Sequence, residues 1–141
     1  MKCFQCSKGK MRSQEAVIEA TVRGETFPVR CEAMICGRCG FQALAPEQAD
    51  GYTAASADGY RLRHGLLSSA EIRGLRENLR MSQVAFAEYL RVGVASVKRW
   101  ELGQVQDDAM DELIRLKCDP VHCLNTLRKL QRGGTEAAWR L

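Results

Sequence analysis

The sequence predicts an α+β fold in which a small antiparallel β domain, residues 1–45, precedes an all-α bundle, residues 68–141. Apolar and polar residues alternate along 26–35, which is the period of a half-buried strand. From residue 68 onward, helix caps recur, followed by apolar residues three or four positions apart. Two Cys-x-x-Cys pairs of identical spacing bracket the strand region and indicate that a metal holds the β domain together.

The β domain is expected to be a hairpin of strands 17–23 and 26–35, joined by a turn at residues 23–25. Pro28 cannot donate a hydrogen bond to a neighbouring strand, so it places the second strand at an edge, at least locally. One face of that strand carries the apolar residues, and we expect all five to point inward: Phe27, Val29, Cys31, Ala33 and Ile35.

The two pairs supply four sulfurs that could occupy the corners of a tetrahedron: Cys3, Cys6, Cys36 and Cys39. So short a domain buries too small a core to be stable alone, so a structural Zn²⁺ would supply its stability. Four protein ligands leave no position open for water, which makes the site structural and not catalytic. An iron site with four cysteine ligands, of the rubredoxin kind, is the chemical alternative, because geometry alone does not separate the two metals. A thioredoxin-like dithiol is disfavoured since neither pair lies in a βαβ context.

Composition narrows the class of protein. The net charge of +4 permits a nucleic-acid partner without demanding one. No apolar run approaches the ~20 residues of a membrane span and the start lacks a signal peptide, so we expect a cytoplasmic protein with reduced thiols and no membrane partner.

The seven cysteines are an odd number, which argues against a disulfide framework. Cys31 and Cys123 are expected to be small buried residues, and Cys118 is assigned no reactivity. His64 and His122 lack ligand spacing and no catalytic motif is present, so an enzyme is not expected.

Residues 46–67 are expected to connect the two domains. Pro46 is typical of the first turn of a helix and Gly65 of its end. Gly51 and Gly59 lie between them, and each costs a helix about 1 kcal/mol relative to Ala. The segment is therefore predicted as a connecting helix that could break near Gly59, with a flexible linker as the alternative.

Within the bundle, residues 82–103 have the layout of a helix-turn-helix. Ser82 would cap the first helix, and the turn at residues 91–93 would end it. Val97 and Trp100 would anchor the second helix, which could then lie in the major groove of DNA. We expect three residues of the first helix to be buried: Val84, Ala87 and Leu90.

Five polar or small residues of this segment are the candidate DNA contacts: Gln83, Ala95, Ser96, Lys98 and Arg99. Arg99 and Lys98 could donate to guanine or to phosphate, and Gln83 could bond a phosphate oxygen. The competing interpretation is an ordinary helical hairpin whose basic residues face solvent. Residues 71–110 hold equal numbers of basic and acidic side chains, so any affinity for DNA must come from the arrangement of the charges or from a dimer.

Further helices flank this pair. Ser68 and Glu71 have capping-box spacing for a preceding helix, and a following one begins at Asp107 or Asp108. The last helix is expected between Asp119-Pro120 and Gly133-Gly134. Its apolar residues 121–130, with the tail through Trp139, exceed what a lone terminal helix needs and predict a homodimer through the C-terminal half.

The chain resembles the MqsA family of antitoxins, which joins a YgiT-type zinc finger to an Xre-type helix-turn-helix. The resemblance rests first on Met1-Lys2-Cys3-x-x-Cys6-x-x-Gly9-x-Met11 and the second cysteine pair. It continues with Leu75-Arg76-x-x-Leu79-x-Met81-Ser82-Gln83 and with Val97-Lys98-Arg99-Trp100-Glu101-x-Gly103, and together these regions cover most of residues 1–118.

The resemblance implies a type II toxin–antitoxin partner. The zinc half would neutralise a toxin, often an mRNA-cleaving ribonuclease, with Cys3, Cys6, Cys36 and Cys39 as the zinc ligands. The helix-turn-helix half would dimerise and repress the shared operon at palindromic double-stranded DNA, with Arg99 reading a base. A transcription regulator without a toxin is the alternative, and an iron–sulfur electron carrier fused to a helical module is a third.

Two positions depart from the family pattern. Ala95 stands where a base-reading Asn is expected, and Ala can contact a thymine methyl but cannot bond adenine, so the operator should differ. Arg91 stands where related turns have Gly. A left-handed conformation there would cost about 1 kcal/mol, unless the turn has another shape.

Overall fold

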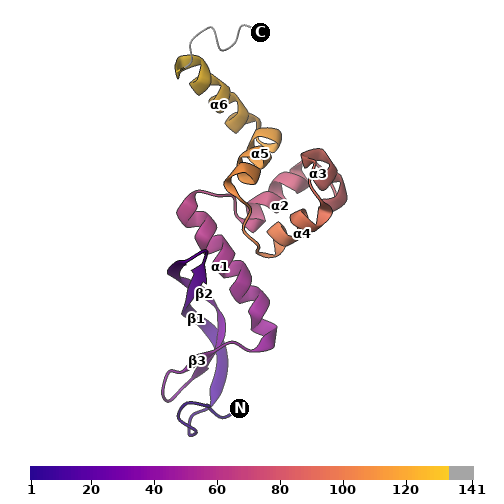
Figure 1. The fold of residues 1–141 in the computed structure, drawn as a ribbon. Coiled ribbons are helices and arrows are strands. Elements are labelled where there is room, and N and C mark those ends of the chain that lie inside the picture. The colour runs from indigo at the N-terminus through magenta and orange to yellow at the C-terminus, as the bar shows by residue number, and fades with distance from the viewer. Residues whose placement is uncertain (134–141) are drawn as a thin grey trace. The chain divides into compact units, whose positions relative to one another are not determined.

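The computed structural model describes residues 1–133, and the expected contribution of Trp139 lies outside them. A small three-stranded antiparallel sheet is followed by helices α1 to α6, so the α+β prediction is confirmed (Figure 1). The chain divides into two compact units. The first contains residues 1–69 and 99–105, and the second contains residues 70–98 and 106–133 of the described chain. Residues 46–67, predicted as a connecting segment, lie in the first unit.

The sheet has the order β1-β2-β3, with β1 at Met11–Val22, β2 at Glu25–Cys36 and β3 at Gln42–Ala43. The two long strands pair along their whole length, from Met11 opposite Cys36 to Val22 opposite Glu25. The predicted start of the first strand at residue 17 was therefore wrong. Residues 12–15 are all polar and exposed, so they carry no alternation, and pairing with β2 alone makes them a strand.

The inward face of β2 is largely as predicted, and it packs on a helix. Phe27, Val29, Cys31 and Ala33 are buried, whereas Ile35 is only half-buried. On one side β2 pairs with β1, and Pro28 takes part in that pairing. On its other side β2 pairs only with β3, through Met34 and Ile35, so in the described chain that side is an open edge at Pro28. Three aromatic or small residues of α1 pack against Ala20, Phe27 and Val29: Tyr52, Ala55 and Tyr60.

Helix α1 spans Ala49–His64 without interruption, preceded by a short 3-10 turn at Pro46–Gln48. The expected break at Gly59 was wrong. A Cβ on Gly59 would lie 2.7 Å from Phe27 Cε2, so the absent side chain gives room for the Phe27 ring and does not interrupt the helix. Gly65 ends α1 in the left-handed conformation, with φ of 67°, as predicted.

The remaining helices are α2 at Ser69–Asn78, α3 at Gln83–Leu90, α4 at Val94–Leu102, α5 at Asp108–Cys118 and α6 at Pro120–Gly133. Ser82 and Asp107 cap α3 and α5 by accepting hydrogen bonds from the Ala85 and Met110 amides, as the sequence predicted. Among the described residues, the largest apolar side chains that are fully buried in these helices are Ile72, Phe86, Leu90, Val97 and Ile114.

The prediction that Val84 is buried was wrong, since its side chain is 55% exposed. Phe86 is fully buried in its place, together with Ala87 and Leu90. Because residues two apart on a helix point in nearly opposite directions, α3 can bury Val84 or Phe86 but not both, and the larger ring takes the interior.

Helix α6 leaves its leucines exposed within residues 1–133, and the side chains of Leu124, Leu127 and Leu130 are 52%, 41% and 52% accessible. Asp119 accepts hydrogen bonds from the Val121 and His122 amides at the start of the helix. Cys123 is half-buried, less than predicted. Among the described residues, no helix has both the length and the apolar character needed to cross a membrane.

Candidate functional site

The four predicted ligands come together at one end of the hairpin. Cys36 ends β2, Cys39 lies in the turn that leads to β3, and Cys3 and Cys6 lie in the loop before β1. All four sulfurs are within 4.8 Å of one another. Cys3 and Cys36 are buried with Met11, and Phe41 packs against this small cluster. The two cysteine pairs are far apart in the sequence, but the antiparallel pairing of β1 with β2 brings them together, because it sets Met11 opposite Cys36.

The spacing of the sulfurs fits a tetrahedral metal ion. The Sγ atoms of Cys3 and Cys39 are 3.6 Å apart, and those of Cys6 and Cys36 are 3.8 Å apart. A tetrahedron with metal–sulfur bonds of about 2.3 Å has edges of about 3.8 Å. The cluster can therefore hold a metal ion with four thiolate ligands and no open position.

Backbone amides support the thiolate form of these cysteines. Gln5 N donates to Cys3 Sγ at 3.3 Å, Gly9 N to Cys6 Sγ at 3.3 Å and Arg38 N to Cys36 Sγ at 3.4 Å. The turn that brings Gly9 to the cluster leaves no room for a side chain, because a Cβ there would lie 2.2 Å from Cys36 Sγ. Gly9 is thus required by the close approach of the two loops.

The helix-turn-helix segment has a defined turn. Arg91 ends α3 in the left-handed conformation, with φ of 61° and ψ of 44°. Of the two turn shapes expected from the sequence, the one with a left-handed Arg91 is therefore confirmed. Its amide donates to the Glu88 carbonyl at 3.1 Å, and Val92 N donates to the Ala87 carbonyl at 3.0 Å. These bonds offset part of the ~1 kcal/mol that a non-glycine residue loses there.

Burial separates the two sides of α4. Val97 and Trp100 are buried, as predicted. Ala95, Lys98 and Arg99 are exposed, and Ser96 is half-buried. The exposed side of α4 therefore presents two cations and one methyl group on neighbouring turns.

Comparison with protein families links the cysteine cluster and the α3–α4 segment to one family. A family model described as the antitoxin component of bacterial toxin-antitoxin systems, MqsA, matches residues 1–128, which include the cysteine cluster and α3–α4. The chain belongs to the MqsA antitoxin family. The curated proteins compared with the chain contain no match to it.

Membership of the MqsA family confirms the resemblance seen in the sequence and the general role of an antitoxin with a toxin partner. It is a family of antitoxins and not of enzymes. In this antitoxin, the two histidines hydrogen-bond to carboxylates and lie outside the cysteine cluster: His64 Nε2 lies 2.8 Å from Glu25 and His122 Nε2 lies 2.8 Å from Glu112.

The pKa values of the cluster thiols are spread apart. The Lys8 and Gly9 amides lower the pKa of Cys6 to about 6, and the Cys39 and Arg38 amides lower the pKa of Cys36. The Phe41 amide lowers the pKa of Cys39, but desolvation of its sulfur and hydrogen bonds to the other three sulfurs outweigh it and raise that pKa to about 12. Cys39 therefore holds its proton more tightly than Cys6 and Cys36 do.

Sequence reasoning missed Leu102, whose side chain is 73% exposed at the end of α4. Leu102 follows Lys98 by four residues and Arg99 by three, so it lies on the same side of the helix. The spacing is visible in the sequence, but a leucine in a helix is more often buried than exposed. Leu102 extends the exposed side of α4 with an apolar group.

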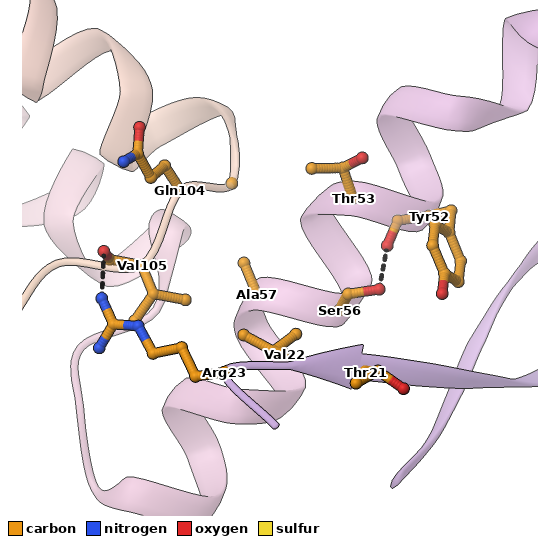
Figure 2. A pocket seen from close by; sticks show the side chains of 10 residues that line it. Thr21, Val22, Arg23, Tyr52, Thr53, Ser56, Ala57, Gln104 and Val105 are labelled. Atoms are coloured by element: carbon orange, nitrogen blue, oxygen red, sulfur yellow. Dashed lines mark hydrogen bonds between the residues drawn. The ribbon is translucent and has the colours of Figure 1, made fainter. Parts of the chain in front are cut away.

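A cavity of 390 Å³ in the first unit was also missed. Figure 2 shows its lining, in which Val22 of the hairpin lies beside Ala57 of α1 and Arg23 lies beside Val105 of the segment after α4. Arg23 donates to the Val105 carbonyl at 3.1 Å, and Ser56 Oγ donates to the Tyr52 carbonyl at 2.7 Å (Figure 2). The lining combines hydroxyl and apolar groups, and it contains no pair of groups suited to acid–base catalysis.

Proposed function

We propose that this antitoxin neutralises its toxin through a zinc-loaded first unit and represses its own operon by binding palindromic DNA as a homodimer. The family match carries the proposal, because it spans the cysteine cluster and α3–α4 in one chain. Seven free thiols favour the reducing cytoplasm as the compartment.

The zinc assignment is supported by the donor set and by its supporting bonds. Four thiolates at tetrahedral spacing, with amide donors to the sulfurs, suit a closed structural zinc site. In this proposal Cys3, Cys6, Cys36 and Cys39 hold the ion. When bound, zinc would supply charge neutralisation and cross-linking, while the chain's own Met11 and Phe41 shield the cluster from water on one side.

The DNA-binding proposal rests on the exposed side of α4. Lys98 and Arg99 can donate to guanine or phosphate, Ala95 can contact a thymine methyl, and Ser96 can bond a base edge or phosphate. Gln83, half-buried at the first position of α3, can bond a phosphate oxygen. The Xre-type assignment of this module belongs to the same proposal.

The toxin is proposed to be an mRNA-cleaving ribonuclease that docks on the first unit. Support comes from the antitoxin family and from the long β1–β2 hairpin, which the metal and α1 would hold in one conformation. A rigid partner loses less conformational entropy on binding, which favours affinity.

Two measurements test the proposed function. The tagged full-length protein, expressed in its own host, should co-purify with a small protein encoded beside it, and that protein should cleave RNA only after separation. In gel shifts, the DNA directly upstream of the reading frame should compete better than unrelated DNA, and Arg99→Ala should weaken specific binding by about 1–3 kcal/mol. A protein that binds this DNA but has no co-purifying toxin would be a free-standing regulator.

A further inference from the structure

Arg61 of α1 carries a charged group that the structure buries completely. Its side chain has no accessible surface. A buried cation is costly unless hydrogen bonds and an opposite charge compensate it. The partners of Arg61 therefore indicate what the fold gains from burying it.

Two of these partners are carbonyl oxygens at the end of α4. Arg61 Nη2 donates to the Trp100 carbonyl at 2.9 Å and to the Gln104 carbonyl at 2.8 Å. Trp100 is among the last four residues of α4, whose carbonyls lack partners within the helix. A cation at this position also interacts favourably with the negative end of the helix dipole. Arg61 thus acts as the C-terminal cap of α4.

The opposite charge comes from Asp58, one turn earlier in α1. Arg61 Nη1 donates to Asp58 Oδ1 at 2.9 Å. Asp58 also accepts hydrogen bonds from the Ser69 amide at 3.0 Å and from the Ser69 hydroxyl at 2.9 Å, at the first residue of α2. The Arg61–Asp58 pair therefore joins the end of α4 and the start of α2 to one helix.

Two further contacts fix the segment that follows α4. Gly103 has φ of 116°, and a Cβ on it would lie 3.0 Å from Ala54 Cα, so the backbones approach too closely for a side chain. Arg23, in the turn of the hairpin, donates to the Val105 carbonyl at 3.1 Å (Figure 2). We call Arg61, Gly103 and Arg23 the α4 clamp.

Arg99 lies inside the segment that the clamp holds. Residues 99–105 group with the hairpin and α1 in the first unit. The Arg99 carbonyl accepts hydrogen bonds from the Gly103 and Gln104 amides at 3.0 and 2.8 Å, directly beside the carbonyls that Arg61 bonds. The backbone from which the Arg99 side chain projects is therefore fixed by α1.

We propose that Arg61 is a positioning residue for DNA recognition, which sets the orientation of Arg99 by capping α4 from α1. The inference rests on the proposed DNA-binding function. Arg61 itself, having no accessible surface, makes no contact with DNA. Its removal should reduce discrimination between DNA sequences and leave the sequence-independent attraction to phosphate in place.

The test uses the full-length, metal-loaded protein and two duplexes of equal length, the DNA directly upstream of its reading frame and an unrelated sequence. Arg61→Gln is compared with Arg63→Gln, which removes the same charge from an exposed side chain two residues away. Arg61→Gln should bind the upstream duplex roughly tenfold or more weakly, the scale of one lost base contact. Affinity for the unrelated duplex should match that of Arg63→Gln, and Arg61→Lys should recover part of the loss.

A double-mutant cycle shows whether Arg61 acts through Arg99. The double variant Arg61→Gln with Arg99→Ala should bind the upstream duplex no more weakly than Arg99→Ala alone. Hydrogen exchange without DNA should be faster at the Gly103 and Gln104 amides in Arg61→Gln than in Arg63→Gln. The positioning role would be overturned if the affinity losses of Arg61→Gln and Arg99→Ala added up in the double variant. It would also be overturned if Arg61→Gln lost equal affinity for both duplexes.

The remaining outcomes separate the two hypotheses. If Arg99→Ala loses discrimination while Arg61→Gln retains it, the proposed function stands and the positioning role is wrong. If the wild-type protein does not prefer the upstream duplex, the proposed DNA function is wrong, and the positioning role with it. Should Arg61→Gln fail to fold, Gly103→Ala perturbs the same clamp elsewhere; it should lose discrimination too, and normal discrimination would overturn the inference.

Discussion

Gly59 of α1 lies against the ring of Phe27 of β2, so closely that a Cβ on Gly59 would approach Phe27 Cε2 to 2.7 Å and Val29 Cγ1 to 3.2 Å. The absence of one side chain therefore sets how near the helix comes to the sheet. The same residue looked like a helix breaker in the sequence, since glycine disfavours helices. Its role is in packing.

Replacing Gly59 by Ala should lower the free energy of unfolding by about 1–2 kcal/mol. Overpacking typically costs about 1–3 kcal/mol, and the better helix propensity of Ala returns up to about 1 kcal/mol. Urea unfolding of the full-length protein measures the difference. Gly51→Ala is the matched control, because Gly51 is in the same helix and a Cβ added there would meet no atom within 4 Å, so it should be neutral or stabilising. Equal effects of the two substitutions would show that Phe27 does not constrain Gly59.

The parts of this fold that follow from local rules were predictable. Caps at Ser82 and Asp107, the end of α1 at Gly65 and the buried alternation of β2 depend on neighbours in the sequence, and each is where the sequence put it. The cysteine cluster was also predictable, because ligand type and spacing in the sequence are enough to indicate it.

The errors arose where tertiary packing decides. The polar start of β1 is a strand because β2 pairs with it, and Val84 is exposed because Phe86 competes for the same interior. The α4 clamp could not be predicted either. Arg61 and Gln104 are far apart in the sequence, and nothing about an arginine in a helix indicates that it will be buried.

Removing the metal should unfold the end of the hairpin that carries the cysteines. Chelation or Cys36→Ser should collapse the dispersed amide signals of residues 1–10 and 37–44 in a two-dimensional NMR spectrum. The residues near Phe27 should be less affected because α1 packs on them. Zinc binding by finger peptides is worth an apparent ~10–16 kcal/mol, so the change should be large.

Metal analysis of the same sample identifies the ion. One zinc per chain in a colourless protein is expected, and a coloured protein containing iron would contradict the zinc assignment. Cys123→Ser is the control, since it removes a thiol outside the cluster and should keep the full metal content. Dispersed signals after complete metal removal would show that the fold of the hairpin end does not need the ion.

The Cys6 thiol should titrate near pH 6 as long as the hairpin end keeps its fold, and near its ordinary 9.0 once metal removal has unfolded that end. The pKa of Cys6 falls from its ordinary 9.0 to about 6, so the folded state favours its thiolate. That contribution to stability is present above the unfolded pKa of 9.0 and is lost as the pH falls through about 6. Raising the pKa of Cys39 to about 12 has the opposite sign: its contribution is present below 9.0 and is lost as the pH rises through about 12.

Proton release on zinc binding measures this shift. In metal-free protein whose hairpin end is still folded by NMR, Cys6 is already ionised at about pH 7.5, so binding should release about one proton fewer than at about pH 5. Calorimetry in buffers of different ionisation enthalpy counts the protons. In Cys6→Ser the ultraviolet thiolate absorbance that develops near pH 6 should disappear. Proton release that does not change between the two pH values would contradict a lowered pKa at Cys6.

The leucines of α6 should hold two copies of the chain together. At 100° per residue, Leu124, Leu127 and Leu130 lie within about a third of the helix circumference, while Lys129 and Arg132 lie on the other side. A homodimer would remove the exposed leucine side chains from water, at about 25 cal/mol for each Å² buried. Sedimentation of the full-length protein at micromolar concentration should show a dimer, and Leu127→Glu should give a monomer. Asn125→Glu adds the same charge on the basic side and should leave the dimer intact; if both variants stay dimeric, the contact between copies lies elsewhere in the chain.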